Sequence, residues 1–188
     1  MPEDSRIIEV RHGFGLLFMG VSISVILGSI LSEIAFVNSA PLYYHIPIWL
    51  ASFSIPCGAI FGKFPKVISA IQGRMKGSVM WPVKTKAIDG ICWAAPFATI
   101  PIMPHSYQFL ILLGIGLGNF STYIIIKKYN REDNREQLIV GLISLTSIPV
   151  AMSIDITVLA ARHDIAVMLS RILISIAYGA GGIYALKH

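Results

Sequence analysis

The chain has 188 residues, of which 55% are hydrophobic and 13% charged, and its formal net charge at pH 7 is +5. Soluble domains carry roughly 25% charged residues, so this composition excludes an ordinary soluble globule and a disordered chain, and two cysteines exclude a disulfide framework. The sequence predicts an all-α, polytopic membrane helix bundle in a single domain over residues 1–188, with no nucleic-acid partner.

Six stretches of the chain are long and apolar enough to cross the hydrocarbon core of a bilayer, which takes about 20 residues of helix. We predict membrane helices over 13–37, 43–62, 87–103, 106–126, 138–160 and 165–186. The first run is far longer than the apolar core of a signal peptide, so we interpret it as a retained helix. The third is the shortest and contains Pro96 and Pro101.

The positive charges sort to one side of this six-helix arrangement. Thirteen of the 15 Lys and Arg residues precede the first helix, follow the sixth, or lie in the loops 63–86 and 127–137. The opposite side receives only Arg162, and Arg171 is embedded. Because basic residues accumulate on the cytoplasmic side, we predict a multi-pass protein of the cell membrane with both termini cytoplasmic.

The basic cytoplasmic loop at 63–86 is the only loop with room for structure of its own. After Pro65, apolar residues recur at helical spacing at Val67, Ile68, Ile71 and Met75, which is typical of a short amphipathic helix on a membrane surface. Trp81 is expected at the level of the lipid headgroups. The loop is either a lipid-anchored connector or a docking surface for a cytoplasmic partner.

Small residues form a stripe along the first predicted helix. They are spaced four apart, at Gly20, Ser24, Gly28 and Ser32. Small residues allow helix backbones to approach closely, which is how helices associate within lipid. The stripe therefore predicts helix packing, either inside the bundle or against another subunit.

Three charged residues fall inside the predicted spans, at Glu33, Asp155 and Arg171. At 1.5 Å per residue, all three are expected about 6–9 Å below the outer membrane boundary. The short connection between the last two helices makes those helices antiparallel neighbours, so we predict an Asp155–Arg171 ion pair with Glu33 nearby. Such a cluster either neutralises its own burial cost or lines an outward-facing pocket for an ion or small polar solute.

Histidines and enzyme motifs give weaker signals. His45, His105 and His163 are predicted at the outer ends of helices, where histidines are commonly polar caps. Their long spacings disfavour a metal site, and their shallow positions disfavour haem ligation. We predict no metal site, and the cofactor stays open. Asp89 is interpreted as an acid at the start of the third helix, favoured by the helix dipole. No P-loop, HExxH, GxSxG or GxGxxG motif occurs, so no catalytic residue is predicted.

Two functions fit these features best. The first is transport or binding of an ion or small polar solute by Glu33, Asp155 and Arg171. The second is a non-catalytic accessory subunit of a larger membrane complex, which short outer loops and the small-residue stripe favour. An enzyme acting on lipid or quinone has the least support. The expected partners are the lipid bilayer and other membrane subunits or a second copy of the chain.

Overall fold

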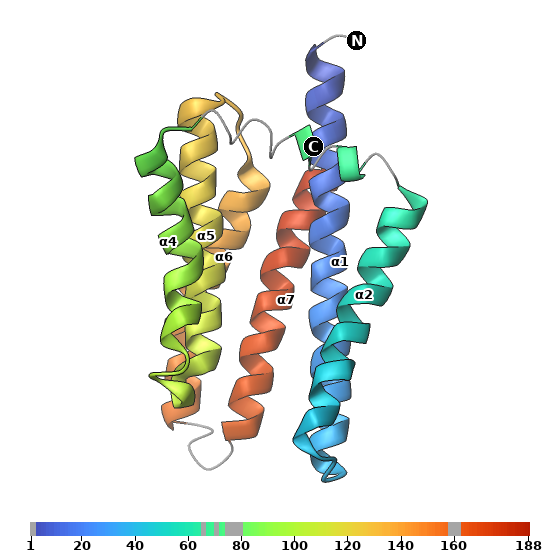
Figure 1. Ribbon diagram of the computed structural model, residues 1–188, viewed down its shortest axis with the longest axis vertical. Helices are drawn as coiled ribbons and strands as arrows, with labels where there is room; N and C mark the ends of the chain where they lie inside the picture. Colours follow the sequence, from blue (N-terminus) through green and yellow to red (C-terminus); the bar gives the residue numbers. More distant parts are fainter. Residues whose placement is uncertain (1–2, 65–66, 70–71, 74–80, 158–162) are drawn as a thin grey trace.

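The computed structural model describes residues 3–64, 67–69, 72–73, 81–157 and 163–188, which are helices joined by short turns and contain no strand (Figure 1). The long helices are α1 (Glu3–Val37), α2 (His45–Lys63), α4 (Val83–Thr99), α5 (Tyr107–Tyr129), α6 (Arg135–Thr157) and α7 (His163–Lys187). Two short 3-10 helices, η1 (Leu42–Tyr44) and η2 (Pro104–Ser106), precede α2 and α5. The prediction of an all-α bundle is confirmed.

Five of the long helices in the described part of the chain are long and apolar enough to cross a membrane. The exception is α4, which has 17 residues. It covers 83–99 rather than the predicted 87–103, because Pro82 occupies its N-cap and Pro101 lies beyond its last turn. The chain is therefore a membrane-associated helical protein by length and composition.

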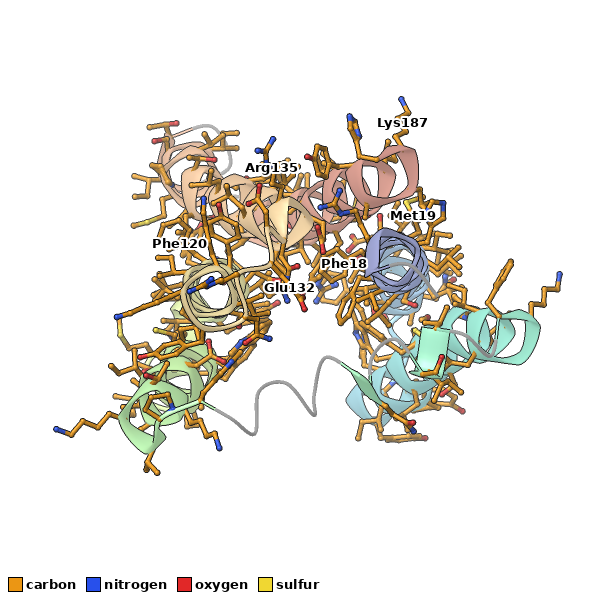
Figure 2. All side chains as sticks on the ribbon, turned by 90° about the horizontal axis from the view of Figure 1, so that it is seen from above. Phe18, Met19, Phe120, Glu132, Arg135 and Lys187 are labelled. Carbon is orange, nitrogen blue, oxygen red and sulfur yellow. The ribbon has the colours of Figure 1, made fainter. Side chains whose placement is uncertain are left out.

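The helices run alternately up and down and stand side by side in an open arc (Figures 1 and 2). Neighbours along the arc are α4, α5, α6, α7, α1 and α2, in that order. Both chain termini lie at one end of the bundle, which we call the terminal end and which carries Arg11, Arg135 and Lys187. The opposite end, with Val37, His45 and Thr157, is the distal end.

Four helices, α1, α5, α6 and α7, share the main hydrophobic core. Its buried members include Phe14 and Phe18 of α1, Leu112 and Ile115 of α5, Val140 of α6, and Ile174 and Ala177 of α7. Each of the flanking helices α2 and α4 packs mainly against one neighbour, α1 and α5 respectively. Most of the surface of these two helices is consequently exposed.

Aromatic rings attach the two flanking helices to glycines of the core helices. A Cβ atom placed on Gly28 of α1 would lie 2.5 Å from the ring of Trp49 on α2. In the same way, Trp93 of α4 lies directly over Gly118 of α5. Because glycine has no side chain, each ring reaches the backbone of the core helix, so both contacts depend on glycine.

The small-residue stripe of α1 packs within the chain. Its members Gly20, Ser24, Gly28 and Ser32 are all buried. A Cβ on Gly20 would lie 2.6 Å from Ile60 of α2, and the hydroxyl of Ser24 donates to the carbonyl of Gly20. Within the chain, Gly20, Ser24 and Gly28 of the stripe therefore face α2.

Part of the basic loop belongs to the described residues. Residues 67–69 and 72–73 are helical, in agreement with a short helix there, and Val67 is buried. Trp81 is also buried and donates from Nε1 to Oδ1 of Asn130 at 2.9 Å, so its indole has a protein partner. Ile71 and Met75 of the predicted amphipathic pattern lie outside the described residues. The same is true of four basic residues, Lys66, Arg74, Lys76 and Arg162.

Candidate functional site

The predicted ion pair between Asp155 and Arg171 does not form. The guanidinium of Arg171 lies over the ring of Trp49, with its Cζ 5.4 Å from the ring centroid. The carboxylate of Asp155 instead accepts a long hydrogen bond of 3.5 Å from Nε2 of Gln108 on α5. Among the described carboxylates, none lies within the 4.0 Å of an ion pair from Arg171, and this includes Glu33.

The reason lies in the position of α7 between two neighbours, α6 and α1. The face of α7 that carries Arg171 also carries Ser175 and Gly182, and this face packs on α1. The hydroxyl of Ser175 donates to the carbonyl of Ser22 at 3.0 Å, and a Cβ on Gly182 would lie 3.0 Å from the carbonyl of Gly15. Arg171 thus points towards α1 and α2, whereas Asp155 points towards α5 on the far side of α6.

The structure also leaves the three predicted residues as separate charges. Arg171 of α7 contacts α2 through Trp49, whereas Asp155 of α6 contacts α5 through Gln108. Glu33 lies four residues before the last residue of α1, and no ion pair joins it to Arg171.

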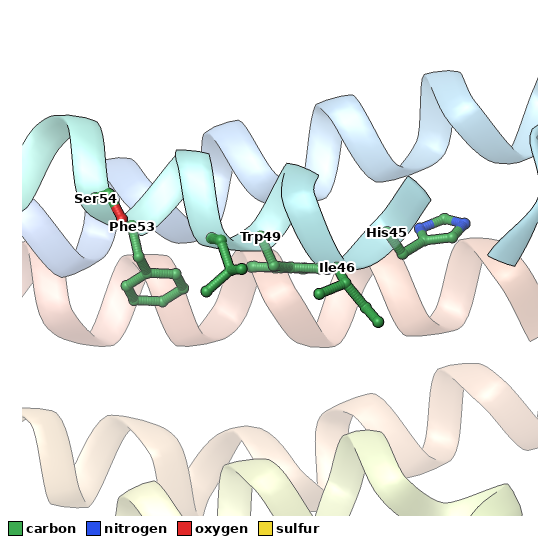
Figure 3. Close-up of a pocket in the computed structure, with 6 residues that line it drawn as sticks. His45, Ile46, Trp49, Phe53 and Ser54 are labelled. Carbon is green, nitrogen blue, oxygen red and sulfur yellow. The ribbon is translucent and has the colours of Figure 1, made fainter. Parts of the chain in front are cut away.

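An apolar groove lies on the surface of α2 (Figure 3). Its volume is about 490 Å³, and it is lined by His45, Ile46, Trp49, Leu50, Phe53 and Ser54. Trp49 belongs both to the groove and to the contact with Arg171. This arrangement places a cation, an aromatic face and an apolar surface together, and these are groups that bind a molecule with a negative charge and an apolar part.

A second polar site links α4 to α5 through Asp89. The carboxylate oxygen Oδ1 of Asp89 accepts hydrogen bonds from the hydroxyls of Ser121, at 2.6 Å, and Thr122, at 3.0 Å. Thr122 accepts in turn from Nε1 of Trp93 at 3.1 Å, which leaves its own proton directed at Asp89. Three side chains are thereby ordered around one carboxylate.

The predicted role of Asp89 at a helix start is wrong. Because α4 begins at Val83, Asp89 is its seventh residue, beyond the first turn where the helix dipole acts. Pro82 was the signal for the true start, since proline is common at the beginning of a helix. With the helix started there, Asp89 and Trp93 fall four residues apart on one face.

A third polar network closes the terminal end of the four core helices. The fully buried Glu136 of α6 has its Oε2 4.0 Å from Nε of Arg11 on α1. Arg11 also donates to the carbonyls of Asp133, at 3.1 Å, and His188, at 3.5 Å. One side chain of α1 therefore connects α1 to the start of α6 and to the end of the chain. Glu136 lies just outside the predicted span 138–160, so the apolar pattern gave no sign of this role.

The carboxylate of Asp133 is the other centre of this network. It accepts from Nε of Arg135 at 2.6 Å and from the hydroxyl of Tyr123 at 3.2 Å, and Nζ of Lys127 lies 4.0 Å away. Burial alone would raise the pKa of Asp133. The hydrogen bond and charge of Arg135, with Tyr123 and Lys127, outweigh burial and hold the pKa below its usual value of 3.8.

The described residues contain no group of three or more His, Cys, Asp or Glu side chains able to hold a metal ion. His45 is the first residue of α2 and His105 lies in η2, so both occur at the distal end, as expected from the sequence. Comparisons with protein-family models, with curated proteins and with solved structures found no match to this chain.

Proposed function

We propose that this protein is an integral membrane protein that binds and carries a small molecule bearing a negative charge, with Arg171 as the residue that contacts the charge. The supporting observation is the surroundings of Arg171. Its backbone lies within the apolar helix α7, its guanidinium rests on Trp49 near the distal end of α2, and no described carboxylate lies within ion-pair distance of the guanidinium. Charged side chains within a membrane are costly and usually have a functional partner, so an external anion is the natural complement.

This proposal includes six spanning helices. At 1.5 Å per residue, α4 is about 26 Å long, which is close to the roughly 30 Å of a hydrocarbon core. It runs beside α5 through most of its length and connects the terminal end to the distal end (Figure 1). An α4 that spans the bilayer places both chain termini on the same side.

The proposed orientation has the terminal end in the cytoplasm. Basic residues gather at that end, namely Arg11, Lys63, Lys84, Lys86, Lys127, Lys128, Arg131, Arg135 and Lys187. The positive-inside rule favours this side as the cytoplasmic one. Arg171 then lies in the outer half of the membrane, and its ligand approaches from outside or from the outer leaflet.

A second candidate function, that of an accessory subunit, is favoured by the uncovered face of α2. A Cβ atom on Gly58 or Gly62 would meet nothing within 4 Å, and the same is true of Gly90 on α4. Small residues on a membrane helix usually permit close approach of another helix. In this alternative, α2 packs against a helix of a partner protein.

Purification of the full chain from its native membrane in mild detergent separates the two candidates. Native mass spectrometry then reports the assembly and anything bound to it. A mass that is a multiple of 20.6 kDa plus an anionic small molecule, with that molecule lost in Arg171→Gln and kept in Lys187→Gln, supports the carrier. Other polypeptides in fixed stoichiometry support the subunit. Wild-type protein that retains no anion, or retains the same anion in Arg171→Gln, contradicts the first proposal.

A further inference from the structure

We propose that the ligand of this site is an anionic phospholipid, with its phosphate against Arg171 and an acyl chain in the groove on α2. This inference rests on the proposed binding of a negative charge at Arg171 and adds the chemical class of the molecule that carries it.

The lining of the groove favours a ligand with a long apolar part. Ile46 and Leu50 are each 64% exposed, and Phe53 is 37% exposed. The polar members, His45 and Ser54, stand at the two ends of the lining sequence. A small polar solute would find few hydrogen-bond partners between them, whereas an acyl chain would cover apolar side chains.

The shape of the groove suits an acyl chain that lies along the membrane normal. Residues four apart on a helix stack above one another, so His45, Trp49 and Phe53 form one row on α2. Ile46, Leu50 and Ser54 form a second row beside it. From residue 45 to residue 54, the two rows extend about 14 Å along the helix axis. The groove is therefore elongated parallel to the helices, as lipid chains are.

The position of the cation fits a phospholipid headgroup. Trp49 is four residues, or about 6 Å, from the first residue of α2 at the distal end. The guanidinium over its ring is thus near the region in which headgroups lie, and the groove continues from Trp49 towards the middle of the bilayer. A guanidinium binds a phosphate through two parallel hydrogen bonds. A zwitterionic headgroup also contains a phosphate, but its own cationic group competes with the guanidinium for that phosphate.

Thermal stability of the detergent-solubilised full chain measures this binding directly. The probes are phosphatidylglycerol, phosphatidylcholine with the same acyl chains, and inorganic phosphate, each titrated separately. We expect phosphatidylglycerol to raise the melting temperature at concentrations at which phosphatidylcholine and inorganic phosphate have no effect. Arg171→Gln should weaken the apparent affinity for phosphatidylglycerol by about tenfold or more, because it removes the charge-assisted contact.

Two further variants make the result specific. Leu50→Trp fills the groove at an exposed position, so the protein should fold while its affinity for phosphatidylglycerol falls. Lys187→Gln removes an equal charge at the opposite end of α7 and should leave the affinity unchanged. The Leu50→Trp variant also keeps the test valid if Arg171→Gln fails to fold.

The outcomes separate this inference from the function on which it rests. If inorganic phosphate binds through Arg171 and phosphatidylglycerol acts no better than phosphatidylcholine, the lipid is refuted while anion binding stands. If neither anion depends on Arg171, both proposals are refuted. The third outcome is a preference for phosphatidylglycerol that is lost in Lys187→Gln and kept in Leu50→Trp. This result would assign the lipid to the terminal end and refute binding in the groove on α2.

Discussion

Gly141 of α6 is the position at which an added methyl group tests the packing of the core most directly. A Cβ atom there would lie 2.9 Å from the backbone nitrogen of Phe120 and 3.1 Å from the carbonyl oxygen of Gly116, both on α5. Ordinary van der Waals contact begins at about 3.4 Å. Since the neighbours are backbone atoms, no side-chain rotation relieves the contact, and α5 and α6 must move apart by about 0.5 Å or more.

The expected cost of Gly141→Ala follows from two opposing effects. Forcing an extra carbon into a well-packed contact costs about 1–3 kcal/mol of unfolding free energy. Replacing glycine by alanine inside a helix returns about 0.5–1 kcal/mol, because alanine loses less backbone freedom on folding. We therefore expect a net destabilisation of up to about 2.5 kcal/mol, with a central value of about 1 kcal/mol.

Gly58→Ala is the matched control for this variant. A Cβ at Gly58 meets nothing within 4 Å, so only the gain in helix propensity applies. The free energy of unfolding of both variants is measured for the full chain in mixed micelles, by titration with a denaturing detergent. If Gly141→Ala is as stable as Gly58→Ala, then α5 and α6 do not approach as closely as described, and the argument from glycine contacts fails.

Three further predictions concern the polar networks and the threading. The ionised carboxylate of Asp133 stabilises the fold fully above pH 3.8, and this stabilisation is lost as the pH falls through the lowered pKa of Asp133. In Asp133→Asn, the melting temperature should therefore fall less steeply on acidification than in the wild type. Asp89→Ala should cost about 1–3 kcal/mol and Asp89→Asn less, because asparagine keeps an accepting oxygen for two hydroxyls; equal losses in unfolding free energy would refute this. With Cys57 and Cys92 replaced by serine, a cysteine at Ala40 should react with an impermeant thiol reagent added outside intact cells, and one at Lys187 should not; labelling of both or of Lys187 alone contradicts the proposed topology.

The long apolar helices were predictable because they depend on composition, which is local. Long apolar runs indicated α2, α5, α6 and α7, each within three residues of its observed bounds. They also indicated the end of α1, but that helix begins at Glu3, ten residues before the predicted span 13–37. The ends of a helix were harder to predict where polar residues extend the helix beyond its apolar part. Glu136 belongs to the first turn of α6 and is fully buried, yet the apolar run begins only at Leu138. Hydropathy alone gives no sign that a charged residue at such a boundary turns inward.

Partner choice between helices was not predictable from the same patterns. The helical spacing of Arg171, Ser175 and Gly182 places these three residues on one face of α7. It did not say which of two neighbouring helices that face meets, because α7 packs on both α6 and α1. Adjacency in sequence favoured α6, whereas the hydrogen bond from Ser175 to Ser22 places this face on α1. The assignment required the long-range pairing of the first and last helices.

The two ends of the bundle differ in a way that bears on how a ligand would enter. At the terminal end, Arg11 joins α1 to the start of α6 and to the C-terminal residue, and Glu136 lies buried beneath it. At the distal end, the described polar contacts between helices include the long bond of Gln108 to Asp155 and the position of Arg171 over Trp49. Separating the helices at the terminal end would break several charge-assisted contacts at once, whereas separating α2 from α7 would break mainly one. We therefore expect a ligand of Arg171 to enter from the distal end, beside α2, while the network around Arg11 stays closed.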